Sequence, residues 1–329
     1  MSYDTITKPP YEINTEIIRL VASISEKIGR VNESLILPSS PKLRKQNQIK
    51  SIHASLQIEG NTLSERQVTA ILENKAVFGP EKDIREVQNA INAYENIGQF
   101  NAHSNVSFLK AHQMLLEGLV LDAGKYRTEG VGIIKGEMVQ HVAPPYEEVP
   151  YLMKNLFTYL KTSSDLALIK SCVFHYETEL IHPFMDSNGR IGRLWQSVIL
   201  AKEYPIFKYI PFENLVAQNH EAYYQVLSIC DKLGNSTRFI EYMLGLLDDA
   251  LKNILKAHPT ALSQNDRLQH FVTLNILEFT RKGYRNVFKN ISTATASRDL
   301  RRGLEKGMFT SSGDKRLTIY KLETRKLDD

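Results

Sequence analysis

Cysteine is scarce in this chain, with only two among 329 residues. Cys172 and Cys230 lie far apart in the sequence, each inside an apolar helical pattern. Two such residues argue against a disulfide framework and against a cysteine-based zinc site. We therefore expect buried, unreactive thiols and a reducing compartment.

Long hydrophobic runs are also missing. No apolar stretch reaches the roughly 18 residues that a membrane-spanning helix needs. The first residues, MSYDTITKPPYEINTE, lack the basic segment and the apolar core of a signal peptide. These absences predict a cytoplasmic protein without a membrane partner.

Neither sign of charge dominates the chain, because it contains 41 Lys and Arg residues and 37 Asp and Glu residues. The hydrophobic content of 42% and the charged content of 24% are typical of a globular protein. The positive charge is concentrated at the end: between residues 260 and 329, Lys and Arg outnumber Asp and Glu by 14 to 8. A basic tail on a nearly neutral body indicates a separate module with an anionic partner.

Apolar residues recur at helical spacing over most of the chain, which predicts a mainly α fold. One helix start is sharply marked, because Ser64 and Gln67 form a capping-box pattern and Leu63 with Val68 can form a hydrophobic staple. Helices are expected over residues 14–31, 43–60, 87–100, 108–117, 149–161, 166–180, 194–204, 219–233 and 236–258.

One segment departs from the helical pattern. GVGIIKGEMVQHVAPP, residues 130–145, is rich in β-branched residues and is centred on Lys135-Gly136, which predicts a hairpin. It is the only strong strand signal before residue 300.

The tail follows Pro259 and a polar stretch, which we interpret as a domain boundary. We expect helices over 266–283 and 293–307, and strands over 308–311 and 316–322. The second half of this order resembles a winged helix-turn-helix. Cationic residues stand where such a module contacts phosphates, namely Arg298, Arg301, Arg302, Lys315 and Arg316. Because winged helices also dock proteins or dimerise, a DNA partner and a protein partner both remain open.

The stretch IHPFMDSNGRIGR, Ile181 to Arg193, concentrates the chemistry. Ser187 to Gly189 tolerates a tight turn whose N–H groups point into one concavity, and a helix is expected to begin there. Amides at a helix start, with the helix dipole behind them, form an anion site. Arg190 and Arg193 are three residues apart, so both can face the same side and hold a di- or triphosphate.

Two further side chains complete this pattern. Asp186 is a hard oxygen ligand suited to Mg²⁺ that bridges phosphate oxygens. His182 has a reference pKa of about 6.5, which suits proton abstraction near neutrality. Singly, each residue fits an ordinary polar turn before a helix. The whole set in register instead predicts a phosphoryl- or nucleotidyl-transfer site.

The stretch resembles the motif of the Fic family, His-x-Phe-x-(Asp/Glu)-Gly-Asn-(Gly/Lys)-Arg-x-x-Arg. The positions that match are His182, Phe184, Asp186, Asn188, Gly189, Arg190 and Arg193. Ser187 departs from the motif, because the family usually has glycine there and a Cβ strains a turn with positive φ. Gly189 resembles the nucleotidyl-transferring majority of the family rather than the branch that phosphorylates its target.

The resemblance implies a way to bind a protein target. Fic proteins have a β-hairpin flap upstream of the motif that pairs with the target's backbone as an added strand, and residues 125–145 occupy that place. The flap residues implied to contact the nucleotide are Val131, Gly132, Ile133 and Ile134. Further along the chain, Tyr224 is implied to flank the adenine and Asp231 to accept from its amino group.

The resemblance also implies inhibition. SLQIEGN, Ser55 to Asn61, is similar to the family's inhibitory motif, whose glutamate reaches the second motif arginine. Glu59 would then pair with Arg193 and prevent the γ-phosphate from settling. The alternative is a glutamate that merely ends a helix before a glycine cap. His175 has two interpretations as well, a metal ligand beside His182 or a core histidine, and we favour the core.

Together these features predict a helical Fic core with a flap, in three parts: an N-terminal helical region with the inhibitory motif over 1–105, a catalytic core over 106–258 and a winged helix over 259–329. The implied activity is transfer of AMP from MgATP to a Ser, Thr or Tyr hydroxyl of a protein. Two alternatives remain open, a nucleotide-sensing DNA-binding regulator and a hydrolase that removes AMP with the same site. A homodimer is a further open expectation.

Overall fold

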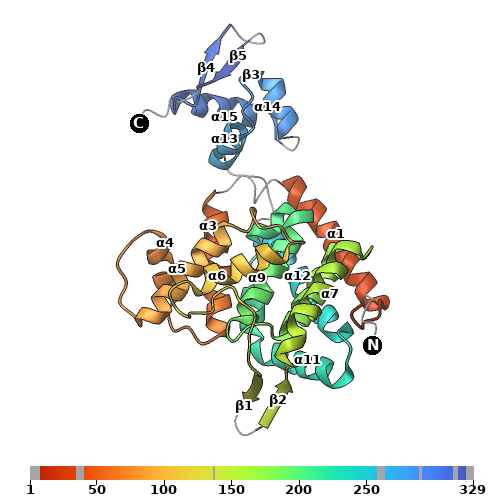
Figure 1. Ribbon diagram of the computed structural model, residues 1–329. Helices are drawn as coiled ribbons and strands as arrows, with labels where there is room; N and C mark the ends of the chain where they lie inside the picture. Colours follow the sequence, from red (N-terminus) through yellow and green to blue (C-terminus); the bar gives the residue numbers. More distant parts are fainter. Residues whose placement is uncertain are drawn as a thin grey trace. The chain divides into compact units, whose positions relative to one another are not determined.

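The structure is a computed structural model that describes residues 8–34, 41–135, 138–257, 264–288, 291–313 and 318–323. The chain divides into two compact units, Met1–Ile28 with Lys45–Asn253 and Gly29–Arg44 with Ile254–Asp329. The fold is mainly helical, as predicted (Figure 1). Among the helices described, none is both long enough and apolar enough to cross a membrane.

Helices make up most of the chain before residue 258. Their bounds are α1 Thr15–Ser34, α3 Pro41–Ile58, α4 Glu65–Leu72, α5 Glu81–Glu95, α6 Asn105–Leu116, α7 Val149–Thr162, α8 Ala167–Ile181, α9 Asn188–Glu203, α10 Phe212–Gln218, α11 His220–Leu233 and α12 Thr237–Ala257, with the 3-10 helices η1 Tyr146–Glu148 and η2 Pro205–Tyr209. The helix predicted over 87–100 corresponds to α5. Its predicted start is wrong, because α5 begins at Glu81, almost two turns earlier. Pro80 precedes the helix, and the acidic Glu81 and Asp83 in its first turn favour that start through the helix dipole, although neither adds to the apolar pattern.

Local signals set the ends of α3 and α4. The Ser64 side chain accepts from the N–H of Gln67, and the Gln67 side chain accepts from the N–H of Ser64 at 3.0 Å, so the predicted capping box is confirmed. Gly60 has φ +89°, which glycine adopts without strain, and it ends the helical path of α3. Glu59 is thereby left directly after the last residue of α3, Ile58.

The core of the first unit surrounds the pair α8 and α9. Trp195 of α9 is fully buried, and its ring centroid lies 5.1 Å from that of Phe108 and 6.5 Å from that of Phe174. Gly192 lets α9 approach α8 closely, because a Cβ there would lie 2.9 Å from Cδ2 of His175. Helix α9, which begins at the motif, is therefore packed closely into the core of the first unit.

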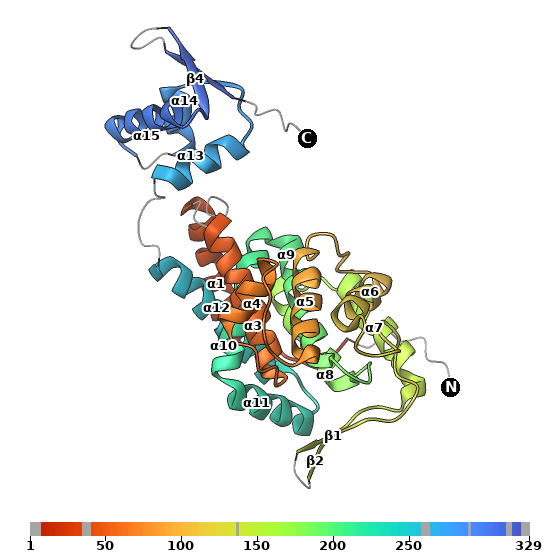
Figure 2. The ribbon, with the colours of Figure 1, turned by 90° about the vertical axis from the view of Figure 1, so that its left-hand side faces the viewer.

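The predicted hairpin is confirmed. Strands β1 Gly132–Lys135 and β2 Met138–Val142 pair antiparallel, with a register shift between Ile133 and Ile134. In Figures 1 and 2 the hairpin projects from the helical body beside α11. Gly136 and Glu137 lie outside the described residues.

The second unit has its own core. Helices α13 Gln264–Thr273, α14 Arg281–Val287 and α15 Thr293–Glu305 accompany an antiparallel sheet of β3 Glu278–Thr280, β4 Phe309–Ser312 and β5 Ile319–Leu322, in the order β3-β5-β4. Phe271, Tyr284 and Phe309 are buried together there. Arg267 and Asp299 form a buried ion pair at 2.6 Å. A separate core is what an independent module requires.

The helix predicted over 266–283 is wrong. Asn275 has φ +51°, a left-handed conformation that asparagine tolerates, and α13 ends two residues earlier at Thr273. Residues 278–280 instead pair with β5, and this pairing buries Phe279 against Phe271, with ring centroids 4.4 Å apart. The predicted wing residues Lys315 and Arg316 lie outside the described residues.

Candidate active site

Two left-handed residues bracket the loop between α8 and α9. His182, which follows the last residue of α8, has φ +49°, and Ser187, which precedes the first residue of α9, has φ +68°. Asn188 closes the loop, because its side-chain oxygen accepts from the N–H of Phe184 and its amide donates to the Phe184 carbonyl, both at 2.9 Å. The loop thus returns to the N-terminus of α9, where the helix dipole favours an anion.

A buried pair of rings supports this loop. Phe184 is fully buried and stacks on His112 with ring centroids 3.6 Å apart. Nδ1 of His112 accepts from the N–H of Gly124 at 2.9 Å, so Nε2 carries the proton and donates to the Asp186 carbonyl at 3.1 Å. Burial lowers the pKa of His112 to about 4. Sequence reasoning missed His112, because only the fold brings it to the motif.

Arg127 ties the same loop to the hairpin. Its Nε donates to the carbonyl of His182 at 2.8 Å, and its backbone N–H donates to the carbonyl of Pro183 at 3.0 Å. The guanidinium also donates to the carbonyls of Glu129 and Pro144, which flank the hairpin. One buried side chain therefore fixes the motif loop and both ends of the hairpin together.

His182 is held in a definite tautomer. Its Nδ1 lies 3.3 Å from the carbonyl oxygen of Glu179. A carbonyl oxygen only accepts, so the neutral ring carries its proton on Nδ1 and keeps Nε2 basic. This is the form that a general base needs.

Arg190 is buried between two carboxylates. Nη1 lies 2.9 Å from Glu86 and Nη2 lies 3.0 Å from Asp186, whose side chain is 48% exposed. Asp186 also accepts from the N–H of Ser187. Mg²⁺ is commonly bound by one or two carboxylates together with substrate phosphates, so Asp186 fits the predicted metal role. Over the described ranges, no group of three His, Cys, Asp or Glu side chains is placed to hold a metal ion.

Arg193 is fully buried and is paired with Glu59. Its Nη2 lies 2.6 Å from Oε1 of Glu59 and donates to the carbonyl of Ser55 at 3.0 Å. Burial by itself disfavours the charged guanidinium, but the charge of Glu59 outweighs it, so the pKa of Arg193 is raised. The predicted pairing of these two residues is therefore present in the fold.

The motif contains buried polar atoms without partners. In the described part of the chain, no hydrogen-bond partner is found for Oγ of Ser187, Nε of Arg190 or Nη1 of Arg193. Such atoms are costly and uncommon in folded proteins. All three belong to the loop end and the first two turns of one helix, α9. A phosphate group would supply the missing acceptors, so these residues fit a nucleoside triphosphate.

The remaining residues predicted to contact the nucleotide lie on two elements. Tyr224 and Asp231 lie on α11, and residues 131–134 lie at the start of the hairpin and on β1. Tyr224 is half-buried, and burial followed by the charges of Glu59 and Glu179 raises its pKa. The Tyr176 hydroxyl donates to Asp231 at 3.5 Å. Val131 is half-buried and Gly132 is exposed, whereas the side chains of Ile133 and Ile134 lie outside the described part. The contacts of Tyr224 and Asp231 with the adenine, and of the hairpin residues with the nucleotide, stay predictions.

His175 belongs to the core, as we favoured. It is fully buried, with Nδ1 2.7 Å from Oε1 of Gln196 and Nε2 3.0 Å from the hydroxyl of Tyr223. Burial lowers its pKa to about 3. The two cysteines are buried and free of disulfides, also as expected.

Comparison with known proteins decides the family. The model of the Fic/DOC family matches residues 104–200. A crystal structure of a Fic family protein from Desulfovibrio desulfuricans G20 is 36% identical, with a TM-score of 0.75, and the match covers 98% of this chain and 100% of that one. The chain belongs to the Fic family.

Other Fic proteins resemble the chain at lower identity. Two relatives named protein adenylyltransferase fic-1, from Caenorhabditis briggsae and Caenorhabditis elegans, are 27% and 26% identical over 79% and 76% of this chain. The chain spans about half the length of these curated relatives, 53% and 49%. A structure of Fic-1 from Caenorhabditis elegans, 22% identical with a TM-score of 0.62, shares the fold.

The Fic/DOC match contains the hairpin, the His182 loop and both motif arginines, but Glu59 lies outside it.

Proposed function

We propose that this Fic protein is a protein adenylyltransferase, which transfers AMP from ATP to a side-chain hydroxyl of a protein and is inhibited by Glu59. The observation that carries the proposal is the set of three buried, unpartnered polar atoms on Ser187, Arg190 and Arg193 beside a histidine with a basic Nε2. The relatives named protein adenylyltransferase support the same reaction.

The phosphates of ATP would lie over the first turn of α9. The Ser187 hydroxyl, the helix-start amides and Nε of Arg190 supply donors there, and Arg193 holds the γ-phosphate. Asp186 would hold Mg²⁺, which supplies positive charge to the phosphate oxygens when it is bound.

His182 acts on the attacking hydroxyl. Its Nε2 accepts the hydroxyl proton while the hydroxyl oxygen forms a bond to the α-phosphorus and the bond to pyrophosphate breaks. Charge that develops on the α-phosphate oxygens is stabilised by Arg190 and by the amides of α9. Arg127 fixes the backbone position of His182, since its Nε donates to the His182 carbonyl at 2.8 Å.

The target protein would bind along the hairpin as an added strand. Main-chain hydrogen bonds then position the target, and its sequence matters less. Arg127 joins both ends of the hairpin to the His182 loop. A hydroxyl on the added strand is thereby brought toward the base.

Glu59 opposes this reaction by occupying Arg193. A carboxylate at 2.6 Å from Nη2 takes the place that a γ-phosphate oxygen needs. Activity then requires that Glu59 leave; its side chain, on the residue after α3, is 29% exposed, so one side of it already meets solvent.

The test uses the Glu59→Gly variant with ATP labelled either on the α-phosphate or on the γ-phosphate. We expect α-label alone on protein, and roughly 10²- to 10⁴-fold less of it when His182→Ala is added. Label from the γ-phosphate would instead indicate phosphorylation. If ATP binds and neither label transfers, the transferase proposal is wrong, and release of AMP from a pre-modified protein becomes the test of the hydrolase alternative.

A further inference from the structure

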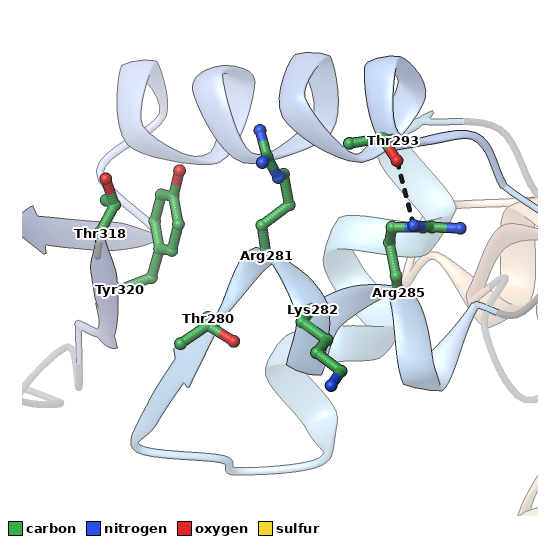
Figure 3. Close-up of a pocket in the computed structure, with 7 residues that line it drawn as sticks. All are labelled: Thr280, Arg281, Lys282, Arg285, Thr293, Thr318 and Tyr320. Carbon is green, nitrogen blue, oxygen red and sulfur yellow. Dashed lines mark hydrogen bonds between the residues drawn. The ribbon is translucent and has the colours of Figure 1, made fainter. Parts of the chain in front are cut away.

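The second unit contains a pocket that the proposed function does not use. Its volume is about 490 Å³, and it lies among the junction of β3 with α14, the start of α15 and strand β5 (Figure 3). The residues that line it are Thr280, Arg281, Lys282, Arg285, Thr293, Thr318 and Tyr320.

The lining is strongly basic. It contains three cations, several hydroxyls and, among the described residues, no carboxylate. Two other cations of the same unit are neutralised: Lys321 pairs with Glu278 at 2.7 Å, and Arg267 pairs with Asp299. Arg281, Lys282 and Arg285 line the pocket and have no such partner in the described ranges; in Figure 3 the Lys282 side chain is directed away from α15.

Hydroxyl groups hold the two arginines in place. Arg285 donates to Oγ1 of Thr293 at 3.0 Å, and Arg281 donates to Oγ of Ser297 at 3.1 Å. Figure 3 shows the side chains of Arg281 and Tyr320 directed toward α15. Neutral hydroxyls orient a guanidinium without neutralising it, so each arginine keeps donors for an anion.

We propose that this pocket binds backbone phosphates of double-stranded DNA. Arginine, lysine, threonine and tyrosine are the usual donors to DNA phosphates. The positive surface also continues beyond the pocket, because Arg298, Arg301 and Arg302 are exposed along α15. An extended polyanion can contact both regions, which a single small anion cannot do.

The lining argues against an acidic peptide. No aliphatic side chain such as leucine or valine lines the pocket in the described part of the chain, and Tyr320 is the one aromatic residue of its lining. Backbone phosphates require only donors and positive charge. The proposed phosphate contacts at the start of α14 add to the phosphate contacts that the sequence predicted for the arginines of α15. They do not depend on the catalytic site.

The test measures fluorescence anisotropy of the full chain with a labelled duplex of about two helical turns. If three phosphates are contacted, the affinity should fall about 40-fold between roughly 50 and 200 mM salt. Lys282→Glu should weaken binding at least 10-fold, because it reverses a charge in the pocket. Lys282 makes no hydrogen bond or ion pair with a described residue, so its replacement should leave the thermal unfolding temperature unchanged.

The matched control is Lys321→Glu, which makes the same change at a lysine already paired with Glu278. Arg285→Gln serves as a second variant, since it removes the charge and keeps a polar side chain that can donate hydrogen bonds. The proposal is overturned if DNA does not bind at low salt, or if Lys282→Glu and Lys321→Glu weaken binding equally. It is also overturned if poly-glutamate binds as tightly as DNA, or if inorganic phosphate alone binds the pocket and DNA does not.

Discussion

Glu59 Oε1 and Arg193 Nη2 lie 2.6 Å apart, although 134 positions separate the two residues in the chain. The guanidinium is fully buried, and its second terminal nitrogen, Nη1, has no partner among the described residues. One terminal nitrogen of Arg193, Nη2, therefore donates to a carboxylate, while the other, Nη1, can still donate to a further anion. In the proposed reaction ATP competes with Glu59 for this arginine, so we expect Glu59 to control the activity of the site.

His182→Ala should lower AMP transfer by roughly 10²- to 10⁴-fold in the Glu59→Gly background, because the base that accepts the hydroxyl proton is lost. ATP affinity by calorimetry should change little, since the phosphate donors remain. The control is His103→Ala, whose ring lies 3.2 Å from Nζ of Lys202 at the surface. Equal loss in both variants would contradict the role of His182.

Ser187→Gly should stabilise the fold by about 1 kcal/mol, because Ser187 has φ +68° and a Cβ is strained in that conformation. Urea unfolding of both proteins measures the difference. The buried Ser187 Oγ has no partner in the described part of the chain, so removing it loses no hydrogen bond there. A less stable variant would show that the hydroxyl has a structural role.

Arg127→Lys should destabilise the protein by roughly 2–3 kcal/mol and lower transfer, because a lysine cannot replace the fork that donates to several carbonyls. Thermal unfolding and AMP transfer would be measured side by side. The control is Arg238→Lys, an exposed arginine that pairs with Glu241. If Arg127→Lys behaves like this control, the link between the hairpin and the His182 loop is not what orders the site.

Acid should destabilise the protein through His112. Its pKa is about 4 when folded, against about 6.5 unfolded, so its contribution is complete above about pH 6.5 and is lost as the pH falls toward 4. Between about pH 7.5 and pH 5 the loss amounts to about 2 kcal/mol. Urea unfolding at both pH values should show a weaker pH dependence in His112→Gln. Identical pH dependence in the two proteins would refute this assignment.

The sequence revealed those parts of the site that are local. His182, Asp186, Arg190 and Arg193 stand within one short stretch, so their spacing alone outlined the chemistry. The hairpin and the capping box of α4 were predictable for the same reason, because turn residues and caps act over a few positions.

The parts that were missed depend on contacts between distant segments. His112 matters only because Phe184 stacks on it, and Arg127 only because backbone carbonyls of the loop and hairpin converge on it. Strand β3 has three residues, and its conformation is decided by pairing with β5, which follows much later in the chain. Helical spacing over 266–283 could not reveal that pairing.

The most direct measurement is incorporation of label from α-labelled ATP into protein by the wild type, by Glu59→Gly and by Glu59→Gly/His182→Ala. We predict weak labelling by the wild type, at least 10-fold more by the single variant, and roughly 10²- to 10⁴-fold less by the double variant than by the single variant. Equal labelling by the wild type and Glu59→Gly would contradict control by Glu59, and strong labelling by the double variant would contradict catalysis by His182.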